Sequence, residues 1–359
     1  MAEHAAEYEW RGEGDEAEII LYAPDSAAFE RVLPAAGLPG VESPVYAAAS
    51  PEGLGWVAAS TSHAAPDLLS VPTRGLLLVA DAALGDLEAP EERRRLISRR
   101  LSETRLPHAT GTGVRRICES GARAAAEDGL IEETDLRFFD QLAGDADAVG
   151  RRAVSAGTRD WDLPGTVSAH GVGEIVDAEA AERLGLEPGA LALVCSAEAG
   201  DLGRLALGAH RERILSRIRS GTDFGAEDDL PAAPFETEEA FDLLAATSAA
   251  ANFADGRTGL LLYALRRALG DLAGGLRLRA AWRVGGIEGH EGSLVHRRDL
   301  AAAGEGEVVV SGGSVVAGTG KMCGSVPPFG TRANDGSLPW EEAGVLVRWA
   351  DLDPTEGRT

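Results

Sequence analysis

Two hydrophobic patterns divide the chain. Between residues 89 and 272, most predicted elements are helices with apolar residues on one side, interrupted by a glycine-rich stretch and a buried strand that ends at Cys195. Beyond residue 275 they alternate with polar residues or run together between glycines, as in strands. Helices are predicted over 26–41, 89–107, within 115–147, over 178–184 and 203–220, and as a pair within 236–272. Strands are predicted over 17–23, 76–84, up to Cys195, and over 276–284, 292–298, 306–316 and 344–352.

This order of elements predicts an α+β fold in which mixed β-sheets are packed by helices. The chain shows no internal repeat of 20–50 residues, so a solenoid is not expected. We expect an acidic N-terminal segment over residues 1–16, a single large domain over 17–352, and a C-terminal tail over 353–359.

Charge narrows the choice of partners. The 359 residues carry 34 Lys and Arg against 58 Asp and Glu, a net charge of -24, and Lys321 is the single lysine. Such a surface favours a protein of a salt-rich cytoplasm, as in a halophile, although an acidic protein from a GC-rich genome has the same bias. Because the field repels nucleic acid, we expect no DNA partner, and any RNA contact must use local arginines. The helix over 89–107 is the most basic segment; the alternative is a solvated face whose arginines pair with neighbouring glutamates.

Cysteine and histidine spacing gives no metal motif. Cys118, Cys195 and Cys323 lie far apart and form no Cys-x-x-Cys pair, which predicts reduced thiols and a cytoplasmic location. No two of the seven histidines have the spacing of a helical metal site. No apolar run approaches the roughly 20 residues of a membrane helix, so no membrane partner is expected.

Two glycine-rich stretches have the composition of functional loops. "SAHGVGEIVD", Ser168–Asp177, reads as a catalytic loop, but its Gly-x-Gly lacks the third glycine and the acid of a dinucleotide site. "ATGTGVR", residues 109–115, has no serine nucleophile. It could cradle an anion with backbone N–H groups or form a plain turn.

The order of several blocks carries a family resemblance. They are "AAGLPGV", "LSVP", "LPHATGTGV", "GTVSAHGVGEIVDAEAAERLGLEPGALALVCSAEAGDLG", "ANFADGR", "LVHRRD", "EVVVSGGSVV" and "PPFGTR". Over roughly 32–332 the chain resembles RtcB-type RNA ligases. The resemblance implies an RtcB-like fold. Those ligases join a 3′-phosphate or 2′,3′-cyclic phosphate RNA end to a 5′-hydroxyl end in tRNA splicing and RNA repair. They use GTP and manganese through a guanylylated histidine.

The resemblance carries over the scaffold without the chemistry. The family's nucleophilic histidine corresponds to Phe329, which has no lone pair to form a phosphoramidate. The family's metal ligands are histidines, an aspartate and a cysteine, and most of the matching positions here hold poor ligands. Those positions are Leu78, Asp81, Glu174, Ser196 and Trp282.

Four basic positions match family residues near the nucleotide: Arg257, His296, Arg298 and Arg332. We take them as candidate nucleotide- or RNA-binding residues, with a solvated or ion-paired arginine as the alternative.

The sequence therefore predicts a catalytically inactive family member that needs no cofactor. It would bind RNA ends or nucleotide, or partner an active RNA ligase. One alternative is an enzyme with a remodelled Mg²⁺ site made of Asp81, Cys195, Glu174 and His170. The other is a ligase still active with GTP and Mn²⁺.

Overall fold

The computed structural model describes thirteen segments of the chain. They are 6–10, 19–23, 43–50, 53–60, 63–80, 90–162, 165–221, 231–271, 275–290, 293–302, 308–311, 314–317 and 345–349. Of the sequence-based expectations, the helix over 26–41 and the tail over 353–359 lie outside these segments.

The fold is α+β, as expected, and its described strands form a ten-stranded sheet. Every strand pair in it is antiparallel, so the expectation of mixed sheets was wrong. Neighbours such as β7 and β8 are joined as a hairpin around a short helix, which returns the chain in the opposite direction. The order is β12 (Val308–Ser311), β13 (Ser314–Ala317), β14 (Val345–Trp349), β7 (Thr166–Ile175), β8 (Leu191–Glu198), β6 (Thr73–Ala80), β10 (Leu276–His290), β11 (Ser293–Ala302), β4 (Gly53–Ser60) and β3 (Ser43–Ser50).

Two smaller ladders lie outside the large sheet. β1 (Ala6–Trp10) pairs with β2 (Ile19–Ala23), so part of the segment expected over residues 1–16 is a strand. β5 (His63–Ala64), followed by the short helix η1 (Pro66–Leu68), pairs with β9 (Ala233–Pro234).

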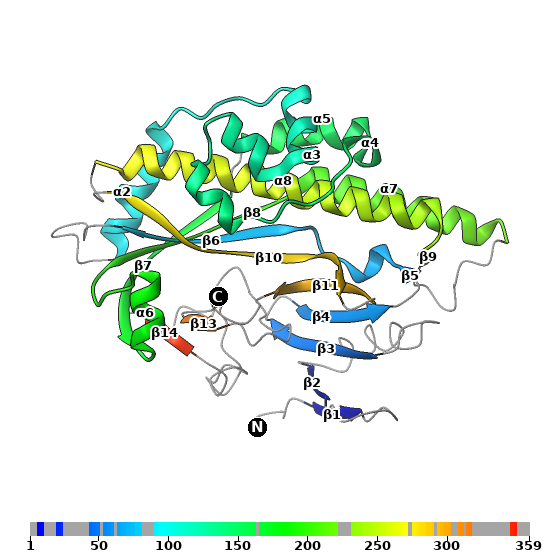
Figure 1. The fold of residues 1–359 in the computed structure, drawn as a ribbon, viewed down its shortest axis with the longest axis horizontal. Helices are drawn as coiled ribbons and strands as arrows, with labels where there is room; N and C mark the ends of the chain where they lie inside the picture. Colours follow the sequence, from blue (N-terminus) through cyan, green and yellow to red (C-terminus); the bar gives the residue numbers. More distant parts are fainter. Residues whose placement is uncertain are drawn as a thin grey trace.

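Helices cover one face of the sheet (Figure 1). The long helix α8 (Glu238–Leu269) crosses this face, and the helices α3, α4, α5 and α7 lie around it. The helices are α2 (Pro90–Glu103), α3 (Gly111–Glu127), η2 (Glu133–Phe138), α4 (Ala146–Val149), α5 (Arg151–Asp160), α6 (Ala178–Leu184) and α7 (Gly200–Arg219). None of the helices in the described segments is both long and apolar enough to cross a bilayer.

Strand β6 is buried on both faces, which explains its unbroken apolar run. Leu76 and Leu78 pack beneath α8, while Leu77 and Val79 pack on the opposite face, which α6 covers. A strand covered on both sides has no polar alternation. The same two-sided burial continues in β8.

Local signals predicted α6 correctly. Asp177 accepts a hydrogen bond from the Ala180 N–H at 2.9 Å, and the helix ends at Gly185, whose φ of 67° is left-handed. Residues 178–184 are helical, as expected.

Two sequence-based expectations about the elements were wrong. "SAHGVGEIVD" is not a loop, because Thr166–Ile175 form β7 and its small residues are paired with β8. The expected helix pair within 236–272 is one helix of 32 residues. Its small central residues allow close packing, since a Cβ added at Gly256 would lie 2.4 Å from the Ile117 Cγ2.

Candidate functional site

Strand register brings together two positions that the resemblance assigns to metal ligands, Ser196 and Trp282. Gly75 of β6 pairs with Ser196 of β8 on one side and with Trp282 of β10 on the other. Residues directly opposite in a sheet point to the same face, here the face away from α8. The Trp282 indole lies over Gly75, because a Cβ added at Gly75 would be 2.1 Å from the Trp282 Cε2. An indole therefore occupies the space beside Ser196.

Hydroxyl groups extend this site along β7. The Thr166 Oγ1 lies 2.8 Å from the Ser196 Oγ, and the Ser168 Oγ lies 2.8 Å from the His170 Nε2. The His170 ring stacks on Trp349, with 5.4 Å between the ring centroids. We call these three hydroxyl-bearing residues and the neighbouring imidazole the hydroxyl row: Thr166, Ser168, Ser196 and His170. The row can exchange hydrogen bonds with a polar ligand.

The other metal positions do not join this site. Leu78 points to the α8 side and packs with Leu76. Glu174 is eight residues beyond Thr166, the partner of Ser196, which places it roughly 26 Å farther along β7. Asp81 and Phe329 lie outside the described residues.

The structure also separates the residues of the remodelled metal site. Cys195 lies in the apolar cluster beneath α8, and burial raises the pKa of its thiol. His170 pairs with Ala192, which packs on the opposite face of the sheet. Cys195 and His170 therefore cannot share an ion. Within the described segments, no group of three His, Cys, Asp or Glu side chains could hold a metal ion.

Arg257 has a structural position at the start of α7. Its Nη1 donates to the carbonyl of Glu198. Burial lowers the pKa of Arg257, and the nearby carboxylate of Asp160 partly opposes this effect. The Asp160 Oδ2 also accepts the Leu202 N–H at 3.1 Å, so the protein's own carboxylate occupies the N-terminus of α7.

His296 is likewise part of the core. Its side chain is fully buried in β11, and its Nε2 accepts the Ala65 N–H at 3.2 Å. The backbone of Arg298 pairs with Trp56, but the Arg298 side chain and Arg332 lie outside the described part of the chain. Arg257 and His296, the two candidates for nucleotide binding whose side chains the structure describes, thus have protein partners.

A buried ion-pair network beneath α8 was missed by sequence reasoning. The Arg74 Nε lies 2.5 Å from the Asp255 Oδ1, and the Arg297 Nη1 lies 2.5 Å from the Glu288 Oε1. Arg283 lies between them, 3.6 Å from Glu288, and burial followed by the charge of Arg74 lowers its pKa. Arginines within apolar strand segments were the available signal, since buried cations need partners.

The stretch over 109–115 is the start of α3. The Thr110 Oγ1 accepts the Gly113 N–H at 3.1 Å and caps the helix. Part of the backbone that could cradle an anion is thereby occupied.

Comparison with models of known protein families finds no match for this chain, and comparison with curated proteins finds none either.

Proposed function

We propose that this chain is a divergent member of the RtcB-type RNA ligase family that has an RtcB-like fold and has lost ligase activity. In this proposal it binds RNA ends or nucleotide, or partners an active ligase, in a salt-rich cytoplasm. The observation that carries the proposal is the pairing of Ser196 and Trp282 across Gly75. The resemblance assigns both positions to metal-binding histidines, and the strand register makes them neighbours.

The groups at these positions are unsuited to manganese. Sites for Mn²⁺ use imidazole, carboxylate or other strong donors. The Ser196 hydroxyl is hydrogen-bonded to Thr166, and the Trp282 indole has no lone pair to donate. Phe329, at the position of the nucleophile, removes the covalent step as well.

The hydroxyl row supports a binding role. Hydroxyls of Thr166, Ser168 and Ser196 donate hydrogen bonds to phosphate or ribose oxygens without requiring a metal. Arg257 and His296 contribute little in this proposal because both have protein partners. The resemblance also assigns Arg298 and Arg332 to the expected site, and the side chains of both lie outside the described residues.

Labelled GTP with Mn²⁺ in high salt tests the loss of activity. We expect no covalent adduct and no joining of RNA ends. A base-stable, acid-labile adduct would overturn the proposal.

A restored variant tests the assignment of positions. Ser196→His combined with Trp282→His should gain affinity for Co²⁺, followed by its visible absorption, because two imidazoles would then flank Gly75. Phe241→His, on the exposed start of α8, is the matched control and should gain none. Failure of the double variant, if folded, would show that these are not the ligand positions.

The binding role has its own measurement. Fluorescence anisotropy should show tighter binding of RNA ending in a 3′-phosphate than of the same RNA ending in a 3′-hydroxyl. Equal binding of the two RNAs would contradict the proposal that the protein binds RNA ends. Copurification of an active ligase from the native host would then support the proposal that the chain partners such a ligase. If no ligase copurifies, the proposed function has no support.

A further inference from the structure

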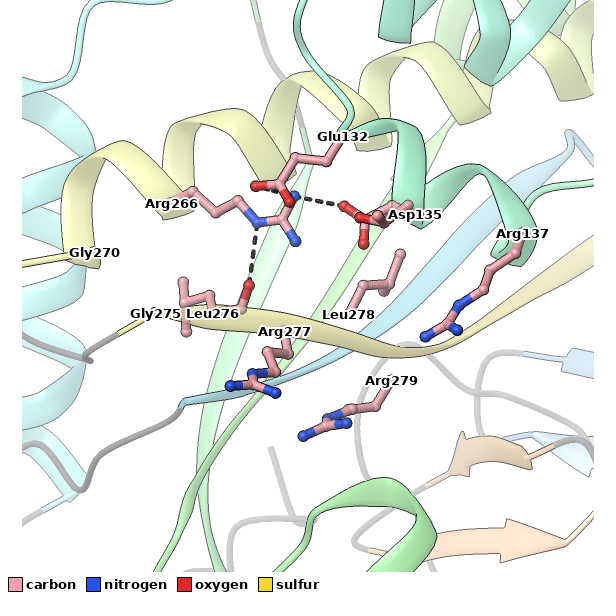
Figure 2. A pocket seen from close by; sticks show the side chains of 11 residues that line it. Glu132, Asp135, Arg137, Arg266, Gly270, Gly275, Leu276, Arg277, Leu278 and Arg279 are labelled. Atoms are coloured by element: carbon pink, nitrogen blue, oxygen red, sulfur yellow. Dashed lines mark hydrogen bonds and ion pairs between the residues drawn. The ribbon is translucent and has the colours of Figure 1, made fainter.

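A hollow of about 480 Å³ lies where α8 ends and β10 begins (Figure 2). Three segments line it: η2 with the residue before it, the end of α8, and the first residues of β10. Its charged lining side chains are four arginines and two acids: Arg137, Arg266, Arg277, Arg279, Glu132 and Asp135. In a chain of net charge -24, this local surplus of positive charge is unusual.

Both acids of the lining bind one arginine. The Arg266 Nη1 lies 2.5 Å from the Asp135 Oδ2 and 3.3 Å from the Glu132 Oε1. The Arg266 Nε donates to the carbonyl of Leu276 at 3.1 Å. Arg266 is therefore fixed by protein partners, and its single positive charge offsets one of the two negative charges of the lining.

A bulge in β10 orients the next arginine. The register with β6 shifts between Leu278 and Ala280, so Arg279 is the extra residue. Leu278 packs beneath α8, whereas Arg277 and Arg279 point away from α8 (Figure 2). Among the described residues the buried Arg279 Nε has no acceptor. A buried donor of this kind is costly unless a ligand supplies an oxygen.

The end of α6 lies beside the Arg279 guanidinium, and a second arginine lines the hollow from η2. A Cβ added at Gly185 would lie 2.6 Å from the Arg279 Nη2, so the group lies against the end of α6. Arg137 extends from η2 toward β10 (Figure 2), and its guanidinium lies 4.8 Å from the Phe138 ring centroid. Arg137 and Arg279 therefore approach from different elements.

We propose that this hollow binds an oxyanion of the phosphate class through Arg137 and Arg279. A guanidinium presents paired donors that match two oxygens of a phosphate. The volume exceeds that of a single phosphate group and lies within the range of small-molecule sites, so a nucleotide or an RNA phosphate can enter. The inference does not rest on the proposed function, because the ligase resemblance assigns no role to these arginines.

Titration calorimetry with inorganic pyrophosphate, and anisotropy with a labelled single-stranded RNA, test the site at several KCl concentrations. We expect Arg279→Gln to weaken binding about tenfold or more, because one charge-assisted contact is lost. Arg279→Lys should weaken it less, since the charge remains. Arg219→Gln, which replaces an exposed arginine at the last residue of α7, is the matched control and should leave the binding of both probes unchanged.

The outcomes separate the sources of the phosphate. Pyrophosphate that binds and displaces RNA indicates an RNA phosphate site, and pyrophosphate that binds without RNA binding indicates a small anion. If Arg279→Gln is unstable, the exposed Arg137→Gln variant replaces it. No binding of either probe, or unchanged binding in a folded Arg279→Gln or Arg137→Gln variant, would overturn the proposal.

Discussion

Replacing Asp255 with Asn should strongly destabilise the protein. Asp255 is fully buried and Arg74 is 2% exposed, and they form a bidentate pair with N···O distances of 2.5 and 3.1 Å. Asparagine keeps the shape of the side chain but removes its charge and one acceptor. Two other carboxylates act on Arg74: Asp140, which lies 3.8 Å away and is 72% exposed, and Glu288, for which no ion pair with Arg74 is found among the described residues. Arg74 would thus be buried without an adequate counter-ion.

The expected cost is about 3–5 kcal/mol, the usual result of removing one partner from a buried pair. Protein stabilities are about 5–15 kcal/mol, so the variant should lose a large fraction of its stability. The pKa of Arg74 likewise depends on the balance between burial and the charge of Asp255. Burial by itself lowers this pKa, but the charge and hydrogen bonds of Asp255 outweigh burial and raise it.

Urea unfolding followed by tryptophan fluorescence measures the loss. The matched control is Asp201→Asn, which breaks an exposed pair with Arg204 at 2.7 Å and should cost at most about 1 kcal/mol. Added KCl should abolish the effect of Asp201→Asn, since salt screens exposed charges, and should leave that of Asp255→Asn. Combining Arg74→Met with Asp255→Leu should recover most of the stability. Equal costs for the two single variants would refute the reasoning.

Three further predictions concern the core. Asn252→Ala removes the donor to the carbonyls of Cys118 and Leu142 where α3 kinks, and should cost about 1–3 kcal/mol in urea unfolding; a cost equal to that of an exposed helix substitution would contradict this role. Gly75→Ala should cost about 1–3 kcal/mol because its Cβ would meet the Trp282 ring, and a double-mutant cycle with Trp282→Ala should abolish that cost. Burial raises the pKa of Cys118 to about 12, above the unfolded value near 8.5, so the unfolded thiol ionises first. The contribution of the protonated Cys118 thiol to the stability of the folded protein is therefore complete below about pH 8.5 and is lost as pH rises toward 12. A thiol reagent at pH 8 should react with Cys118 only when urea unfolds the protein.

Local sequence signals were enough to predict an element whose first and last residues are set by neighbouring cap residues. α6 was predicted to the residue because Asp177 caps it and Gly185 ends it. The helix pair expected within 236–272 is one helix, α8, which contains the polar residues Asn252, Asp255 and Arg257. Each of these side chains binds a partner in another element, which a helical pattern does not reveal.

The site could be predicted only in part. Ser196 and Trp282 were named from the resemblance, but their adjacency depends on both pairing with Gly75. Leu78 lies on the opposite face, toward α8, and a shift of one residue in a strand is enough to reverse the face. The Arg74–Asp255 pair joins residues 181 positions apart, so no local pattern could find it.

In the proposed function Trp282 stands in place of a metal-binding histidine, and this replacement is coupled to the core packing. Trp282 belongs to the apolar cluster on the face away from α8, and its ring requires glycine at position 75. Regaining a ligand there means removing part of a buried indole, whose full truncation costs about 3–5 kcal/mol. A single reversion therefore exchanges stability for one imidazole, while Ser196 still offers a hydroxyl. Under the proposed function, a metal site at these positions therefore needs changes at both Ser196 and Trp282.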